Sequence, residues 1–181
     1  MRWPLATLAL ILLLATGCGD DEEEGLPGDP EGDNRRFVAE LRPLNDSAVQ
    51  GEARLALDGE DLIVRIDARG LERNRVHEQA IHGRRGRGGD ASCPEGGGSG
   101  RLTAQEAERR YGPSILEIEP YPTVRQSGEV HYDLVLTVDP DELSPLSERV
   151  LVLSGATIGS EGQKRYAPDL PVACGVLRAQ S

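Results

Sequence analysis

Residues 61–69 read DLIVRIDAR and residues 129–139 read EVHYDLVLTVD, and these two stretches determine the fold class. In both, an apolar side chain occupies every second position: Leu62, Val64, Ile66 and Ala68 in the first, and Val130, Tyr132, Leu134, Leu136 and Val138 in the second. This period of two is typical of an antiparallel strand with one buried and one solvated face. The chain also holds 22 glycines and 12 prolines, which favours a loop-rich β protein over a helix bundle.

Shorter apolar runs on either side extend the same pattern. They cover Phe37–Leu41, Val49–Leu57, Val76–His82, Ile115–Ile118, Val150–Leu153 and Val172–Leu177. The pair Asp58-Gly59 between two of these runs is a hairpin signal. About eight short strands separated by turn residues predict an all-β sandwich or Greek-key barrel. One short helix is also expected, because Thr103 and Glu106 match a capping box and Gly112 would end the helix.

The charge of the chain argues against nucleic acid as a partner. The 181 residues carry 20 Lys and Arg against 31 Asp and Glu, a net charge of −11, whereas phosphate binding needs a basic face. Aromatic residues make up only 3% of the chain, too few for a platform on which bases stack. Arg84, Arg85 and Arg87 lie in a glycine-rich stretch, residues 83–100, which we interpret as a solvated loop.

Residues 1–17 are typical of a signal peptide. Arg2 precedes an uncharged run, Leu5–Ala15, which is too short to span a bilayer, since spanning needs about 20 apolar residues. Small residues then lead into Cys18, in a sequence that resembles a bacterial lipobox. We expect a lipid on Cys18 to hold the chain at a membrane of the bacterial cell envelope, at the outer membrane or the periplasmic face. The alternative is an ordinary cleaved signal with an incidental cysteine.

Residues 18–34 are expected to form a tether between the lipidated Cys18 and the domain. The segment after the cysteine, GDDEEEGLPGDPEGDN, holds eight acidic residues and no basic ones. Low hydrophobicity combined with like charge prevents collapse, so this segment is predicted to be extended and disordered. The folded domain is then residues 35–181. Because much of the negative charge lies in the tether, the net charge says little about the ligand of the domain.

Cys93 and Cys174 remain once Cys18 is assigned to a lipid. An even pair of cysteines in an exported chain predicts a disulfide. It would close a loop of about 80 residues and stabilise the fold by on the order of 4 kcal/mol in the chain-entropy model. The alternative, two free thiols that bind a metal, has less support because the chain has no Cys-x-x-Cys and an exported compartment is oxidising.

Several segments of the domain resemble copper/zinc superoxide dismutases. The residues that carry the resemblance are Val49-Gln-Gly51, Gly70–Gly83 (GLERNRVHEQAIHG), Arg149–Ser154 (RVLVLS) and Pro171–Leu177 (PVACGVL). Cys93 falls just beyond the histidine-containing stretch, as the first disulfide cysteine of that family does. The resemblance covers roughly residues 36–178 and implies an eight-stranded Greek-key β-barrel with one intramolecular disulfide.

The residues for the chemistry of that family are mostly missing. His82 matches a copper ligand, but Ala80 stands where its partner ligand would be, and Ser154 stands where a later copper ligand would be. Pro171 replaces the arginine that guides the substrate, and His77 matches a structural histidine that hydrogen-bonds to backbone. Three histidines in the whole chain cannot complete a copper/zinc site. His82 is therefore interpreted as a vestigial copper ligand, and no cofactor is expected.

The sequence favours a catalytically inactive superoxide dismutase-like domain that serves as a structural or binding module at the membrane. A protein partner or a homodimer fits this interpretation, with the ligand unidentified. The alternative is a superoxide dismutase or a copper-binding protein, with or without turnover, that uses a reduced site around His82. That site would combine His82 with His131 and a carboxylate, Asp90 or Glu78. A further alternative is an adhesion-like β module in which the cysteine pair is dispensable; no other catalytic motif stands out.

Overall fold

The two stretches that dominate the sequence pattern pair with each other in the computed structural model, which describes residues 35–85, 89, 91–95 and 101–180. They form β3 (Asp61–Arg69) and β6 (Glu129–Thr137). The strands are antiparallel, with Leu62 opposite Leu136 and Ile66 opposite Tyr132. The predicted alternation in β3 is confirmed, because its apolar positions are buried and the intervening positions are partly or fully exposed.

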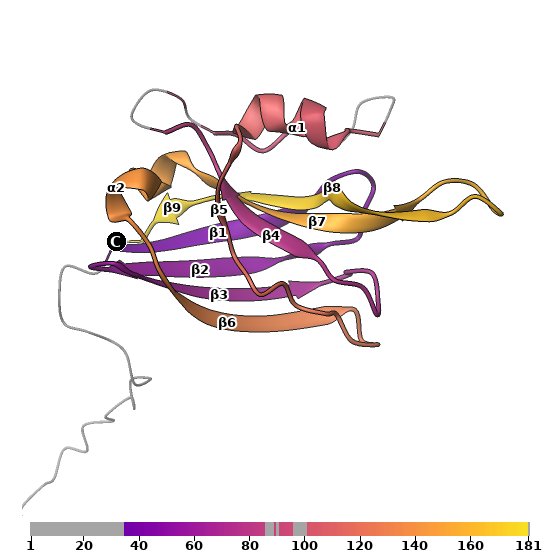
Figure 1. Cartoon of the computed structure of the whole chain (residues 1–181), viewed down its shortest axis with the longest axis horizontal. Coiled ribbons are helices and arrows are strands. Elements are labelled where there is room, and N and C mark those ends of the chain that lie inside the picture. Colours follow the sequence, from indigo (N-terminus) through magenta and orange to yellow (C-terminus); the bar gives the residue numbers. More distant parts are fainter. Residues whose placement is uncertain (1–34, 86–88, 90, 96–100, 181) are drawn as a thin grey trace, which may run out of the picture. The chain divides into compact units, whose positions relative to one another are not determined.

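Antiparallel pairing joins the strands into one curled sheet (Figure 1). The strand order is β5-β4-β7-β8-β1-β2-β3-β6, and the short β9 pairs with β1. The remaining strands are β1 (Arg35–Pro43), β2 (Gln50–Asp58), β4 (Glu78–His82), β5 (Ser114–Glu117), β7 (Val150–Ile158), β8 (Arg165–Val176) and β9 (Arg178–Ala179). We call β6, β3, β2 and β1 sheet half A, and β5, β4, β7 and β8 sheet half B.

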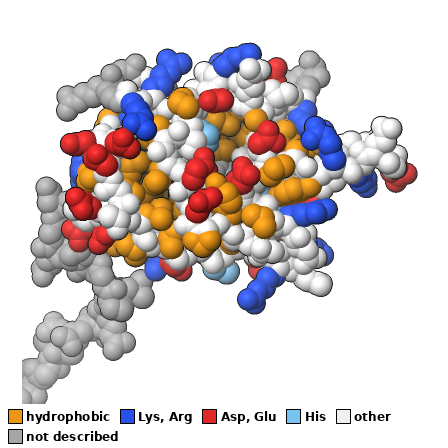
Figure 2. Space-filling model, in the orientation of Figure 1, with side chains coloured by type: hydrophobic (Ala, Val, Ile, Leu, Met, Phe, Trp, Pro, Cys, Tyr) orange, Lys and Arg blue, Asp and Glu red, His pale blue; other side chains and the backbone are white. Residues whose placement is uncertain are grey.

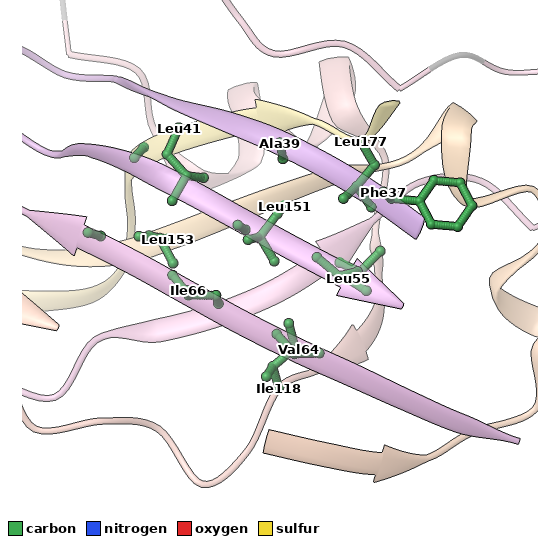
Figure 3. Close-up of a cluster of buried hydrophobic side chains, with 14 of the residues drawn as sticks. Phe37, Ala39, Leu41, Leu55, Val64, Ile66, Ile118, Leu151, Leu153 and Leu177 are labelled. Carbon is green, nitrogen blue, oxygen red and sulfur yellow. The ribbon is translucent and has the colours of Figure 1, made fainter. Parts of the chain in front are cut away.

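The hydrophobic core lies between the two sheet halves. Figure 3 shows Leu151 and Leu153 of β7 lying among Leu55, Val64 and Ile66 of half A. All five side chains are 2% exposed or less. A buried apolar group stabilises the fold by about 1.5–3 kcal/mol, so this layer holds the halves together.

The all-β class is confirmed, but the sheet is an open half-barrel and not a closed eight-stranded barrel. Its two end strands, β5 and β6, do not pair with each other, and the described residues form nine strands when the two-residue β9 is counted. The hydroxyl of Tyr132 on β6 donates a hydrogen bond to the Pro120 carbonyl at 2.9 Å, so a side chain links the segment after β5 to β6.

The structure contains one helix more than the sequence pattern predicted, and its β7–β8 hairpin is longer than predicted. The expected helix forms α1 (Ala104–Tyr111), with the Thr103 capping box present. A second helix, α2 (Pro140–Leu143), and a 3₁₀ turn, Leu146–Glu148, follow β6; a four-residue helix is too short to produce an apolar period. The β7–β8 hairpin continues past Leu153 because tertiary contacts, such as Glu72 accepting from the Thr157 backbone N–H at 2.6 Å, hold its arm.

The predicted disulfide between Cys93 and Cys174 is present, with Cα atoms 5.6 Å apart. It connects the segment after β4 to β8. None of the helices in the described part of the chain is long and apolar enough to cross a membrane. The expectations for residues 1–34, lipidated Cys18 included, lie outside the described residues.

Candidate functional site

Strand β4 directs the residues of the candidate site to the outer face of sheet half B. Side chains alternate along a strand, so Glu78, Ala80 and His82 share the outer face while Gln79 and Ile81 point to the core. On β7, Ser154 lies opposite Glu78, and Val152 lies opposite Ala80. Ala80 therefore lies two positions from His82 on the same face, and Ser154 lies across from Glu78 at the other end of β4.

Helix α1 covers this face and forms one wall of the site. Its first turn is fixed by Thr103, which accepts from the Glu106 backbone N–H while the Glu106 carboxylate accepts from the Thr103 backbone N–H. The helix ends at Gly112, whose φ of 85° favours glycine. A Cβ at Gly112 would lie 2.8 Å from the Gly83 carbonyl group, so glycine also permits the close approach of α1 to the end of β4.

His82 is held at the junction of β4 and α1. Its Nδ1 lies 3.1 Å from the Gly112 carbonyl oxygen, and its ring centre lies 4.5 Å from that of Tyr111. A carbonyl only accepts, so Nδ1 carries the hydrogen and the neutral ring has a lone pair at Nε2. Burial lowers the pKa of His82, and the Gly112 carbonyl and the charges of Glu117 and Glu108 partly oppose this change. The site therefore favours a neutral imidazole.

A cleft of about 150 Å³ opens beside His82. Ala80, Val152 and Ser154 line it, as does the side chain of Tyr111. Four carboxylates from four different elements also line it: Glu78 on β4, Glu108 on α1, Glu117 on β5 and Asp169 on β8. In the view of Figure 2, acidic side chains lie next to hydrophobic ones in the middle of the drawn face.

Glu78 experiences repulsion from two other carboxylates of the cleft. Burial raises the pKa of Glu78, and the negative charges of Glu117 and Asp169 raise it further. No described basic side chain forms an ion pair with any of the four. The Glu117 carboxylate instead accepts a hydrogen bond from the Tyr121 hydroxyl at 2.7 Å. The cleft is thus a region of uncompensated negative charge.

A larger hollow lies on the outer face of half A, and the three carboxylates that lie in a row there form ion pairs, unlike those of the His82 cleft. The hollow measures about 450 Å³ and its lining includes Glu40, Glu52 and Asp67, which lie side by side across β1, β2 and β3. Each of these carboxylates is paired: Glu40 with Arg42 at 2.9 Å, Glu52 with Arg54 at 2.5 Å, and Asp67 with His131 at 2.6 Å. The chain neutralises this acidic row internally, so the His82 cleft is the stronger candidate for a charged ligand.

Copper and zinc do not fit the donors of the cleft. Among the described residues, no group of three or more His, Cys, Asp or Glu side chains is placed to hold a metal ion. The composite site considered from the sequence is not assembled, because His131 lies on the outer face of half A, paired with Asp67, and His82 lies on half B. Of the two carboxylates proposed for it, Glu78 lines the cleft with His82, and Asp90 lies outside the described residues.

The other sequence expectations for histidines agree with the structure. His131 is exposed, as its position opposite the apolar face of β6 predicted. His77 is 2% exposed, and its Nδ1 and Nε2 lie 3.1 Å and 3.0 Å from the carbonyl oxygens of Ser154 and Glu72. This contact with backbone joins the segment before β4 to β7, and it matches the structural role that the resemblance implied.

Sequence reasoning missed three of the four carboxylates of the cleft: Glu108, Glu117 and Asp169. They are far apart in sequence and follow no shared motif, so only the strand order and the packing of α1 bring them together. Comparison of the chain with protein-family models and with curated proteins finds no match. The function therefore has to be inferred from the chemistry of the cleft.

Proposed function

We propose that this chain is a superoxide dismutase-like β-barrel protein without metal redox chemistry, which acts as a binding module anchored in the bacterial cell envelope through Cys18. The strand order supports the fold assignment. The chain runs along β1, β2 and β3 of half A and then crosses between halves three times, from β3 to β4, β5 to β6 and β6 to β7. Such long connections between antiparallel strands are typical of Greek-key folds. The Cys93–Cys174 disulfide is consistent with the same family.

The observation that carries the functional proposal is the set of side chains around His82. Redox cycling of copper needs several ligands in a fixed geometry. Here the cleft holds a single imidazole, and Ala80 and Ser154, which also line it, offer only a methyl group and a hydroxyl in place of a second imidazole. The fold retains its glycines and disulfide while the positions for chemistry have changed, as expected where a scaffold serves another function.

The charge of the cleft also argues against superoxide as a substrate. Superoxide is an anion, and a concave site lined by one sign of charge repels ions of that sign. Glu117 and Asp169 lie close enough to Glu78 to raise its pKa. Pro171 stands where the resembled family has the arginine that guides the substrate. A small cavity with a few convergent polar groups is typical of a binding site, so we favour binding over turnover.

Metal retention tests this proposal. The full chain would be loaded with copper and zinc and passed over a weak chelator, and its metal content would be measured by elemental mass spectrometry. We expect less than about a tenth of an equivalent of either metal to remain, because one imidazole competes poorly with water. The variant His131→Ala is the matched control, since it removes a histidine outside the cleft.

The opposite outcome is equally specific. Retention of about one equivalent of copper by the wild-type chain, lost in His82→Ala but kept in His131→Ala, would overturn the proposal. It would support the alternative of a copper protein with a reduced site around His82, and a superoxide turnover assay would then be the next step.

A further inference from the structure

Of the four carboxylates of the His82 cleft, Glu78 is half-buried and the other three are exposed, and none forms an ion pair with a described side chain. Glu78, Glu108, Glu117 and Asp169 line the cleft without an ion pair, whereas the acidic row of half A is paired throughout. From this geometry we infer that the cleft binds a basic side chain, an arginine or a lysine, that a partner polypeptide presents. This inference rests on the proposed function, because it specifies the ligand of the same binding module.

The shape of the cleft suits a long side chain with a charged end. Ala80, Val152 and the ring of Tyr111 give it an apolar surface, and the carboxylates come from different surrounding elements. Arginine and lysine bury aliphatic stems against apolar surface while their charged ends remain in polar surroundings. A cavity of about 150 Å³ has the volume of roughly five water molecules, which is enough for one side chain but not for a folded domain.

The spacing of the carboxylates and the imidazole in the cleft favours an organic cation over a metal ion. A metal needs several ligands close around one point, and the described residues contain no such group. A guanidinium presents five N–H donors spread over a plane, so separate acceptors can satisfy it. The four carboxylates provide such acceptors, and the Nε2 lone pair of neutral His82 adds another.

Three described arginines near the site in sequence do not pair with its carboxylates. Arg109 and Arg110 lie in the last turn of α1, where both are exposed and form no ion pair with the cleft carboxylates. Arg85 instead pairs with Glu142 on α2 at 2.7 Å. Among the described residues, the cation that complements the cleft is therefore not supplied by the chain itself.

A peptide titration tests the inference. The probe is acetyl-Gly-Arg-Gly-amide, and its control is the same peptide with citrulline, which keeps the shape of arginine without its charge. Nuclear magnetic resonance of the isotope-labelled full chain would follow the backbone amides of His82, Ser154 and Asp169. We expect saturable shifts with the arginine peptide, with millimolar affinity because one side chain offers little contact area. The citrulline peptide should bind at least about tenfold more weakly.

Substitutions of the carboxylates then test whether the negative charge of the cleft accounts for binding of the arginine peptide. Glu117→Gln with Asp169→Asn removes two cleft charges with little change in shape, and it should weaken binding of the arginine peptide at least about tenfold. The matched control, Asp61→Asn with Glu129→Gln, makes the same change of charge at exposed positions of half A and should leave the affinity unchanged. The amide spectrum of each variant establishes that it is folded.

Two results would overturn the inference. One is equal affinity for the arginine and citrulline peptides, or equal weakening by both pairs of substitutions. The other is arginine binding that appears only after Arg87→Ala, because the chain's own loop would then be the occupant. The two proposals fail separately: a chain that retains no copper and does not bind the arginine peptide refutes only the ligand, whereas copper retention through His82 refutes the proposed function.

Discussion

Glu78 shows at the residue scale how the cleft departs from an ordinary surface. It lies half-buried on β4, and its carboxyl faces the negative charges of Glu117 and Asp169. Burial and like charge both disfavour ionisation, so the pKa of Glu78 is raised above the ordinary value of 4.5. A position that costs stability in the free protein is expected where a ligand of opposite charge binds.

Replacing Glu78 should therefore stabilise the fold at neutral pH. A raised pKa means that the folded chain binds the proton more tightly than the unfolded chain, so ionised Glu78 costs stability above the folded pKa. We expect Glu78→Gln to increase the free energy of unfolding at pH 7 by less than about 1 kcal/mol, since solvent screens a partly exposed group. The gain should disappear as the pH falls below 4.5, where both states of Glu78 are protonated.

Urea unfolding at pH 7 and at pH 4 would measure this difference. The variant Glu129→Gln is the control, because it removes an exposed carboxylate of half A without changing the cleft. A loss of stability in Glu78→Gln at pH 7, with the control unchanged, would contradict the expected repulsion.

At the scale of elements, α1 determines the shape of the cleft because it carries three of its lining residues, Ala104, Glu108 and Tyr111. The helix has only eight residues, too few to be stable by itself in water. It depends on its capping box, on Gly112 at its end, and on the burial of Ala107 and Tyr111. Local changes at its N-terminus should therefore affect the cleft.

We expect Thr103→Ala to destabilise α1 by about 1 kcal/mol, because the Glu106 backbone N–H loses its acceptor. Hydrogen exchange should become faster at the amides of Ala107 and Tyr111, and binding of the arginine peptide should weaken. Thr137→Ala, at the exposed end of β6, is the control and should change neither measurement. Unchanged exchange in Thr103→Ala would mean that packing alone holds the helix.

At the scale of the whole molecule, two sheet halves meet along a narrow seam. β1 and β8 share only the pairs Arg42 with Cys174 and Pro43 with Ala173, at the place where the disulfide attaches. On the opposite side, β5 and β6 remain unpaired with each other. The core packing therefore holds together a sheet that hydrogen bonds do not close, and the disulfide fixes the segment after β4 to β8 beside the seam.

Removing the disulfide should accordingly be costly. Cys93 and Cys174 are 81 residues apart, and a loop of that length stabilises the folded state by on the order of 4 kcal/mol in the chain-entropy model. We expect the double variant Cys93→Ser with Cys174→Ser to lose about this much free energy of unfolding in urea. A loss below about 1 kcal/mol would instead favour an adhesion-like module in which the pair is dispensable.

The sequence by itself determined the features that rest on local pattern. Strand β3 was predicted at its observed bounds because alternation of apolar residues reports burial directly. The capping box of α1 and the Cys93–Cys174 pair were also predicted, the first from residue spacing and the second from the count of cysteines in an exported chain.

Only the tertiary structure decided the open sheet edge, the long β7–β8 arm and the composition of the cleft. These features depend on contacts between residues distant in the chain, such as Glu72 with Thr157, which no local period records. The same reason explains the site. His82 was singled out from the resemblance, but Glu108, Glu117 and Asp169 join it only because α1 packs at the end of β4, β5 pairs with β4, and β8 follows β7 in the sheet.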